Sequence, residues 1–239
     1  MKAAINRLGE RVDSLDWNSL ESGLLGDGFM LVQKFLVPDE CMELRKLYDG
    51  DEIFRSRVVM ERHNFGRGEY KYFAYPLPET IRELRESFYE KLAPIANRWN
   101  ERLGIAARYP EHQQQFLDFC LDAEQSRPTA LLLRYRAGDY NCMHQDLYGE
   151  LAFPFQLTFF LSSRDEYEGG EFVLMEQRPR AQTRPIVLQP DRGDFVIIPN
   201  RYRPVEGSRG FYRTTFRHGV SEVHSGERFT LGIIFHDAR

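Results

Sequence analysis

A chain of 239 residues, 42% hydrophobic and 28% charged, is long enough for one globular domain with a substantial core. A net charge of −4 gives no global support to nucleic-acid binding, and three cysteines do not make a disulfide framework. No apolar run resembles a signal peptide or a membrane span, so we expect a cytoplasmic protein without a membrane partner.

Residues 1–126 are predicted to be mainly helical. The amphipathic pattern over Ile5–Leu25 indicates a helix broken near Gly23 and Gly26. Further helices are expected at Pro38–Leu47, from Pro78 through Trp99, and at Glu111–Leu121. Short strands are expected at Gly28–Leu36, around Val58–Met60 and at Tyr70–Tyr75.

From residue 127 onwards, short strand candidates alternate with glycine-containing turns. The candidates are Thr129–Tyr135, Phe153–Leu161, Glu171–Met175, Ile186–Leu188, Phe195–Pro199, Tyr212–His218 and Phe229–Phe235. Many short strands at this spacing are typical of a double-sheet jelly roll. We therefore predict an α+β fold in a single domain, residues 1–239. Its double-stranded β-helix (jelly-roll) core covers residues 127–239, and N-terminal helices pack on one of its sheets.

His144 and Asp146 are candidate metal ligands. They follow an apolar strand and a turn, and residues i and i+2 of an extended chain face the same side. Two imidazoles and one carboxylate on one face of a metal leave three coordination positions open, as non-haem Fe(II) oxygenases require. Because an isolated pair of this kind also arises by chance, the site depends on a distant third ligand.

His218 is the strongest candidate for that third ligand, ahead of His224 and His236. We expect a strand ending near His218, a turn centred on Ser225-Gly226, and a returning strand. In such a hairpin His224 falls in the turn, away from the sheet interior, whereas His236 is close to the last residue. The hairpin would bring Arg228 back beside His218.

Arg228 is the candidate for binding a carboxylate, because its planar fork can hold both oxygens. Thr230 faces the same side of the strand, and its hydroxyl can help. The apolar run Leu231–Phe235 implies a buried strand, and a buried arginine needs an anion. The alternative is a surface salt bridge with Glu222 or Glu227.

Two side chains before His144 have alternative interpretations. Tyr135, nine residues earlier, is either a hydrogen-bond donor to the same co-substrate or a core aromatic residue. The sulfur of Cys142 is close enough in sequence to reach the site, but we favour a small, half-buried strand residue there.

Together these residues resemble the Fe(II)/2-oxoglutarate-dependent dioxygenases. The shared motifs are Tyr135…Gly138…Tyr140…His144-x-Asp146, then Glu168–Phe172, Gly193-Asp194, and His218-x9-Arg228-x-Thr230. The distance from His218 to Arg228 is similar to that of the prolyl-hydroxylase-like branch. The segments Asn141–Gly149, Glu168–Arg180 and Leu231–Asp237 look more like a family of bacterial oxygenases described as acting on damaged, methylated DNA. The resemblance covers at least the C-terminal half of the chain.

The resemblance implies that Fe(II) binds to His144, Asp146 and His218. It also implies that 2-oxoglutarate chelates the iron and places its far carboxylate on Arg228 and Thr230. With O2 as the other co-substrate, a substrate C–H bond is oxidised and succinate and CO2 are released. One departure concerns the nucleic-acid demethylases of this superfamily, which usually carry a second arginine a few residues later. Here no arginine follows Arg228 before Arg239.

Two basic segments bear on the substrate. The first holds Arg55, Arg57, Arg62, His63, Arg67 and Lys71 among aromatic residues, and the second holds Arg201, Arg203, Arg209, Arg213 and Arg217. Cations beside aromatic rings can hold phosphates and stack bases, but a solvated strand face or a cleft for an acidic peptide gives the same pattern. If the partner is nucleic acid, Arg67→Ala or Arg203→Ala should weaken its binding.

Three functions therefore stay open. The first is an oxygenase that demethylates alkylated DNA, which would be a DNA-repair activity. The second is a hydroxylase of a protein side chain, of prolyl type, or of a small molecule. The third is a binding module that kept its metal but lost turnover, against which Arg228 and Thr230 argue. The sequence leaves the oligomeric state open.

Overall fold

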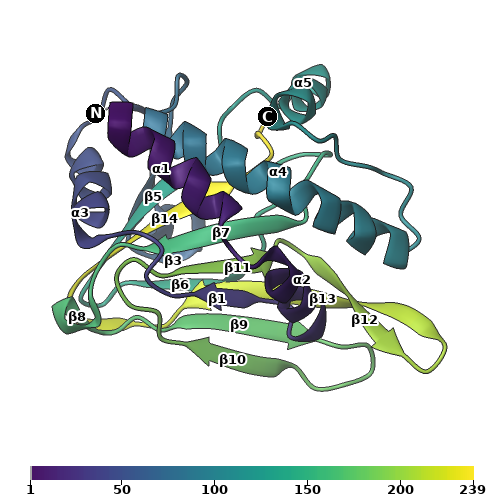
Figure 1. The fold of residues 1–239 in the computed structure, drawn as a ribbon. Coiled ribbons are helices and arrows are strands. Elements are labelled where there is room, and N and C mark those ends of the chain that lie inside the picture. The colour runs from purple at the N-terminus through teal and green to yellow at the C-terminus, as the bar shows by residue number, and fades with distance from the viewer. Residues whose placement is uncertain (1) are drawn as a thin grey trace.

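Two antiparallel β-sheets form the body of the protein in the computed structural model, which describes residues 2–239 (Figure 1). The large sheet has the order β1 (Met30–Val32), β11 (Phe195–Pro199), β7 (Phe155–Phe160), β14 (Val223–Ile234), β5 (Leu131–Arg136), β4 (Glu69–Phe73) and β2 (Phe54–Val59), with β8 (Tyr167–Gly169) pairing with β14. The small sheet has the order β10 (Arg184–Leu188), β9 (Phe172–Gln177), β13 (Gly210–Val220), β6 (Tyr140–His144) and β3 (Gly66–Arg67), with β12 (Tyr202–Gly207) pairing with β13. The predicted α+β fold with a jelly-roll core is confirmed.

The N-terminal half contributes strands as well as helices. β1 extends the large sheet at one end by pairing with β11, and β4 extends it at the other by pairing with β5. The strand expected at Gly28–Leu36 is shorter than predicted. It ends at Val32, because Lys34 adopts a left-handed φ of 55° and its backbone N–H donates to Asp194 at 2.8 Å.

The first predicted helix is two helices, α1 (Lys2–Asp13) and α2 (Trp17–Gly26). The break lies before Trp17 and not near Gly23, because Asp16 accepts a hydrogen bond from the Ser19 N–H and so caps α2. The other helices are α3 (Pro38–Lys46), α4 (Glu79–Arg102) and α5 (Gln113–Asp122), with short 3-10 turns η1 (Leu47–Asp49), η2 (Met60–His63) and η3 (Arg164–Glu166).

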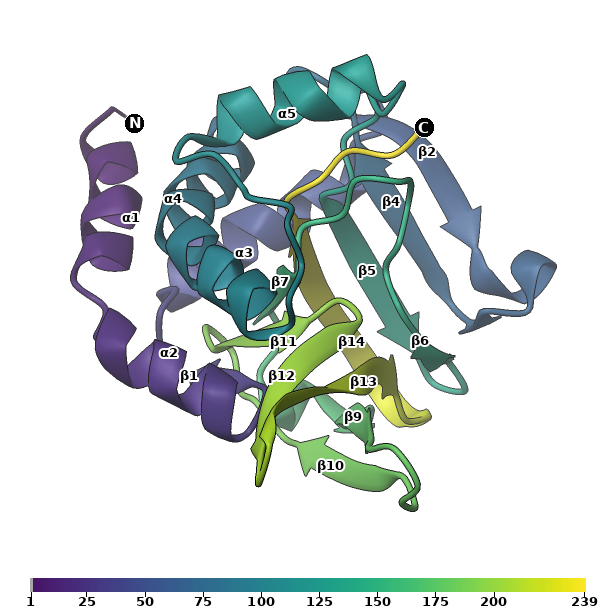
Figure 2. The same cartoon turned by 90° about the vertical axis from the view of Figure 1, so that its right-hand side faces the viewer.

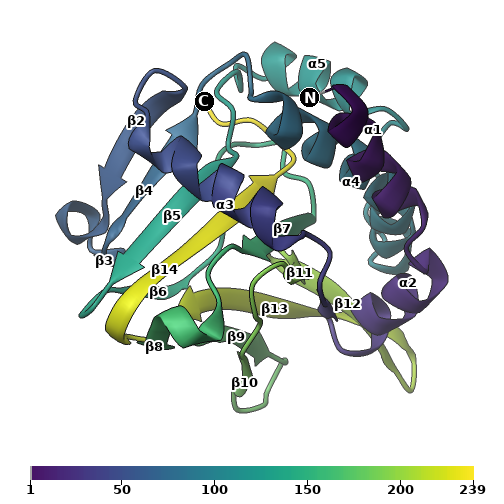
Figure 3. The ribbon, with the colours of Figure 1, turned by 60° about the vertical axis from the view of Figure 1, so that its left-hand side comes forward.

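The helices cover the outer face of the large sheet, as predicted (Figures 2 and 3). The apolar stripe of α4 packs there: the Phe88 ring lies 5.1 Å from that of Phe195, and the Trp99 ring 4.5 Å from that of Phe155. A second buried cluster fills the space between the sheets. The strands β9 and β10 lie on the side away from α1, α4 and α5, so the small sheet has one exposed face, on which Val187 is 58% exposed.

The predicted hairpin after His218 is wrong. β13 belongs to the small sheet and β14 to the large sheet, so the chain crosses between the sheets at Ser221. The crossing is fixed by hydrogen bonds from the Ser221 N–H to Glu171 O and from the Val223 N–H to Asp139 O. Ser225-Gly226 is an irregular stretch inside β14, where Gly226 adopts a φ of +80°. Arg228 therefore reaches the interior from the sheet opposite His218.

Among the described residues, no helix is both long and apolar enough to cross a membrane.

Candidate active site

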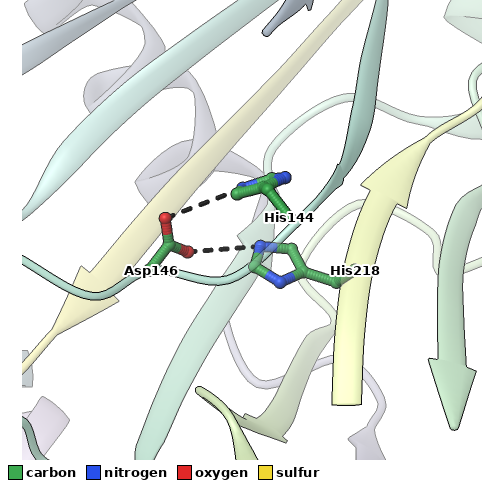
Figure 4. Close-up of side chains that lie close together, drawn as sticks. All are labelled: His144, Asp146 and His218. Atoms are coloured by element: carbon green, nitrogen blue, oxygen red, sulfur yellow. Dashed lines mark ion pairs between the residues drawn. The ribbon is translucent and has the colours of Figure 1, made fainter. Parts of the chain in front are cut away.

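The three proposed metal ligands meet at the interior edge of the small sheet. β6 and β13 run antiparallel with His144 directly opposite His218, and Asp146 follows two residues after His144. One ligand atom from each of the three side chains lies within 4.8 Å of the others (Figure 4). The structure therefore brings together the three residues that the sequence pointed to, two from paired strands and one from the loop beyond β6.

Both imidazoles turn Nε2 toward the carboxylate. His218 Nε2 lies 3.2 Å from Asp146 Oδ2, and His144 Nε2 lies 3.6 Å from Asp146 Oδ1. The Nδ1 atom of His144 lies 2.8 Å from the backbone oxygen of Cys142 and donates to it in the tautomer that leaves Nε2 free. His218 Nδ1 lies 3.5 Å from the side-chain amide of Gln156, whose oxygen can take the same role if the amide is turned over. Such partners fix a ligand ring for metal binding.

Asp146 is buried and ionised. Burial alone would raise its pKa, but the neighbouring His144 and His218 lower it well below its usual range. Burial, and then the proximity of His218, lowers the pKa of His144 below its ordinary value. At neutral pH the site therefore offers a carboxylate and a neutral imidazole, the forms that bind a divalent metal.

A tyrosine that sequence reasoning missed holds the carboxylate. The Tyr148 hydroxyl donates to Asp146 Oδ1 at 2.6 Å and lies 3.0 Å from the Tyr72 hydroxyl. Burial raises the pKa of Tyr148 well above its ordinary value, so it stays a donor. The sequence carried a signal for it, because Tyr148 continues the i, i+2 alternation of His144 and Asp146. Gln156 carried no such signal, because it stands in an apolar strand.

A cavity of about 310 Å³ between the two sheets contains these ligands. Its other wall is the large sheet, from which Tyr135, Arg228 and Thr230 line it. β14 pairs with β5 so that Arg228 lies directly opposite Tyr135, and Thr230 follows on the same face. Thus the predicted co-substrate residues share a cavity with the predicted metal ligands.

Arg228 is buried without an anion. It is 1% exposed, and neither its Nε nor its Nη1 has a hydrogen-bond partner among the described residues. The expected alternative, a salt bridge with Glu227, is not formed, because Glu227 pairs with Arg136 at 2.7 Å. The Arg228 guanidinium lies 5.4 Å from the ring centroid of Tyr135. An uncompensated buried charge is costly, so the residues present fit a ligand carboxylate at this place.

Tyr135 is buried and can donate to that ligand. Its burial raises its pKa to about 12, so the hydroxyl remains protonated. The Asn141 amide lies 3.3 Å from the hydroxyl oxygen and donates to it. Cys142 is exposed rather than half-buried. Its contact with His144 is made by its backbone oxygen and not by its sulfur.

The two rival histidines lie elsewhere. His224 is exposed at the start of β14. His236 is fully buried, and its Nδ1 accepts a hydrogen bond from the Phe153 N–H at 3.2 Å. From the sequence alone, His236 ranks behind His218 as a metal ligand because it is near the C-terminus. In the structure, its place in the core is what keeps it from the site.

In the first basic segment three of the proposed cations already have acidic partners, among them Arg57, which pairs with Glu69. Arg67 pairs with Glu61 at 3.1 Å on the surface. Lys71 is buried and donates to Asp51 at 2.7 Å. Their positive charge is therefore shared with the protein's own carboxylates, and the effect of Arg67→Ala on a polyanion stays a prediction.

In the second basic segment one arginine is structural. Arg203 is 2% exposed, lies 3.2 Å from the carboxylate of Glu176, and donates to the Gly26 backbone oxygen at 2.9 Å. The prediction that Arg203 contacts a polyanion is wrong, because its side chain points inward and cannot be reached. Sequence alone did not distinguish it from the exposed arginines of the same segment.

His236 makes the stability of the fold depend on pH. Burial, with the nearby charge of Arg85, lowers the pKa of His236 from 6.5 to about 4. Between these values the unfolded chain binds a proton that the folded chain refuses, so stability falls as pH falls. We expect this histidine to reduce the free energy of unfolding by about 3 kcal/mol as pH drops from 6.5 to about 4.

Urea unfolding of the wild type and of His236→Gln across that pH range measures this contribution. Carboxylates titrate alike in both proteins, so the variant should show the shallower decline with falling pH. Parallel curves would show that His236 is not the group responsible.

Comparisons with known proteins agree with an oxygenase site in this cavity. Residues 68–238 match a family model, Oxygenase-NA, described as an oxygenase catalysing oxidative methylation of damaged DNA. Two uncharacterised proteins of Mycobacterium tuberculosis, from strains CDC 1551 and H37Rv, are each 47% identical over 167 residues, which is 70% of this chain and 72% of theirs.

Solved structures share the fold at low sequence identity. A Pseudomonas putida prolyl-4-hydroxylase is 12% identical, with a TM-score of 0.53 over 93% of this chain and 99% of its own. An oxidoreductase of the 2OG-Fe(II) oxygenase family from Burkholderia pseudomallei is 14% identical, with a TM-score of 0.53 over 94% of both chains. A Trichoplax adhaerens prolyl hydroxylase, solved with a peptide of hypoxia inducible factor, is 14% identical, with a TM-score of 0.54 over 92% of this chain and 89% of its own. The chain thus belongs to the Oxygenase-NA family and has the fold of the 2-oxoglutarate/Fe(II) oxygenases.

Proposed function

We propose that this protein is an Fe(II)- and 2-oxoglutarate-dependent dioxygenase that oxidises a methyl group on a base of alkylated DNA. The observation that carries the proposal is the buried, anion-free Arg228 in the same cavity as His144, Asp146 and His218. A metal-binding module without turnover has no need for a buried carboxylate site beside its metal.

Residues on one wall of the cavity would hold the metal, and residues on the opposite wall would bind the co-substrate. His144, Asp146 and His218 would hold Fe(II) and leave three positions free for 2-oxoglutarate and O2. Arg228 would bind the far carboxylate of 2-oxoglutarate as a bidentate fork, with the hydroxyls of Thr230 and Tyr135 beside it. When bound, iron, 2-oxoglutarate and O2 supply the oxidant for a substrate C–H bond, with release of succinate and CO2.

Tyr148 positions the carboxylate ligand. Its hydroxyl donates to Oδ1 of Asp146, so that Oδ2, the oxygen 3.2 Å from His218, would be free to hold a metal. The backbone oxygen of Cys142 orients the ring of His144 in the same way. Apolar side chains that line the cavity, Leu133, Phe172 and Val220 among them, would exclude water from the reacting centre.

An aromatic pair at the cavity supports a planar substrate. Phe65 lines the cavity yet is 48% exposed, and its ring stacks on that of His63 at 5.3 Å with an interplanar angle of 23°. An exposed ring at the edge of a reaction cavity is a surface on which a base can stack. A base in duplex DNA must leave the helix to enter such a cavity. The description of the family agrees with a DNA substrate.

The direct test is succinate release in the presence of Fe(II) and 2-oxoglutarate, with parallel panels of methylated oligonucleotides and of peptides. We expect turnover only with methylated oligonucleotides, in proportion to the methyl groups removed, and none with matched unmethylated strands. Turnover with a peptide alone would instead identify a hydroxylase of the prolyl type. No turnover with any member of either panel, in a protein that binds Fe(II), would contradict the oxygenase assignment for these substrates.

The ligand assignment predicts a sharp difference among the histidines. His144→Ala, Asp146→Ala and His218→Ala should each abolish turnover and weaken Fe(II) binding, because each removes one of three donor atoms. The exposed His224 provides the control, since His224→Ala should behave as the wild type. Full activity in His218→Ala would remove this residue from the site.

The co-substrate assignment predicts that Arg228→Lys is not conservative. An ammonium group cannot reproduce a bidentate fork, so we expect a loss of about 1.5–3 kcal/mol, or roughly ten- to a hundredfold in affinity for 2-oxoglutarate. The Michaelis constant for 2-oxoglutarate measures it. Arg136→Lys is a matched control on the adjacent strand, because Arg136 is exposed and paired with Glu227. An unchanged constant in Arg228→Lys would place the co-substrate elsewhere.

A further inference from the structure

Two guanidinium groups lie against a single tyrosine ring on the surface. The Cζ atoms of Arg201 and Arg213 are 4.5 and 4.6 Å from the ring centroid of Tyr202. β12 and β13 hold the three residues together, since Tyr202 pairs with Thr215 and Pro204 with Arg213. The ring attracts each cation, but the two cations repel each other. We call Arg201, Tyr202 and Arg213 the Tyr202 cluster.

The Tyr202 cluster has no acidic partner. Arg201 and Arg213 are exposed, and neither side chain forms an ion pair or donates a hydrogen bond to any residue that the structure describes. Some other exposed arginines have carboxylate partners (Arg57 with Glu69, Arg82 with Glu86, Arg136 with Glu227), so what sets the cluster apart is that two unpaired guanidinium groups share one ring. A cation pair held on a ring without an anion is the arrangement expected of an anion-binding surface.

The positive charge extends along the same hairpin. Between residues 201 and 217 the exposed charged side chains are Arg201, Glu206, Arg209, Arg213 and Arg217. Four cations against one acid stand out in a chain whose net charge is −4. The spread of four cations over residues 201–217 suits a partner with repeated negative charges rather than a single small anion.

The Tyr202 cluster lies close to the cavity. Gln145, which lines the cavity between His144 and Asp146, donates to the backbone oxygen of Phe216 at 2.7 Å. The Phe216 N–H in turn donates to the backbone oxygen of Arg201 at 2.7 Å. The hairpin of β12 and β13 lies beside α2 and the end of α4, where the Arg102 guanidinium is 5.5 Å from the ring centroid of Phe211 (Figure 2). Arg213 of β13 and Tyr202 of β12 stand on the sheet face opposite His218, so a polymer with one unit in the cavity would pass around the sheet beside Gln145 to reach the cluster.

We propose that the Tyr202 cluster binds the phosphate backbone of a single nucleic-acid strand whose methylated base occupies the cavity. This inference rests on the proposed function and adds the path of the strand. The two planar forks suit phosphodiester oxygens, and the tyrosine ring holds them in place without consuming their charge. Such contacts carry affinity and register but no sequence information, so the enzyme would accept many sequences around the methylated base.

Binding of a fluorescent, methylated single strand of about 12 nucleotides to the full chain, over a range of salt concentrations, tests the inference. Arg201→Gln and Arg213→Gln should each weaken binding roughly threefold at low salt and reduce the slope of log K against log salt by roughly 0.7, and the double variant by about twice that. Tyr202→Leu should weaken binding, whereas Tyr202→Phe keeps the ring and should rescue it. Arg82→Gln on α4 is the control for loss of one exposed charge.

A second readout separates this inference from the proposed function. The ratio of kcat/KM for the methylated oligonucleotide to that for the free methylated nucleoside should fall in Arg201→Gln and Arg213→Gln, because only the oligonucleotide has a backbone to bind. If methylated oligonucleotides are oxidised but the slope and this ratio match the wild type, the strand path is wrong and the proposed function stands. If an acidic peptide is the substrate and its turnover depends on the same arginines, both proposals are overturned.

Discussion

The pairing of His144 with His218 across β6 and β13 is the constraint on which the site depends. A strand shifted by one residue turns every side chain to the other face, so a slip here would move an imidazole from the cavity to the exposed face of the small sheet. Gly219 permits the pairing, because a Cβ atom there would lie 2.7 Å from the backbone oxygen of Asn141. The ladder becomes irregular between His218 and Val220 and then ends at the crossing to the large sheet.

That crossing explains why His218 and Arg228, ten residues apart in the chain, line one cavity from opposite sheets. The proposed metal ligands stand on or beside the small sheet, and the proposed co-substrate residues stand on β14 and β5 of the large sheet, with the cavity between them. Because β14 is covered by helices on its other side, Arg228 has no route to solvent except through the cavity. The same burial that makes its charge costly also shields the carboxylate it would bind from water.

The sequence predicted the parts of this design that follow from short-range periodicity. His144 and Asp146 could be placed together because alternate residues of a strand share a face. The partner of a strand is not encoded so locally: Ser225-Gly226 looked like a turn, whereas the chain crosses at Ser221, which has no adjacent glycine or proline. The sequence pattern also did not indicate which arginines of the second basic segment are buried. Arg203 is buried and Arg213 is exposed, although both stand in strands of alternating polarity. Gln156 could be linked to His218 only by knowing that β7 passes beneath β13.

Phe65 lies in the turn between η2 and β3, whereas Arg213 stands on β13, the same strand that carries the proposed metal ligand His218. Met60 of η2 is fully buried in the cluster between the sheets, so changes there reach the core, whereas the side chains of Phe65, Arg201 and Arg213 are exposed and stand outside that cluster. The proposed substrate-binding side chains are therefore separable from the packed core residue by residue, not element by element. In the course of evolution, or in the hands of an engineer, the enzyme's target can be exchanged while its oxidative chemistry is inherited unaltered.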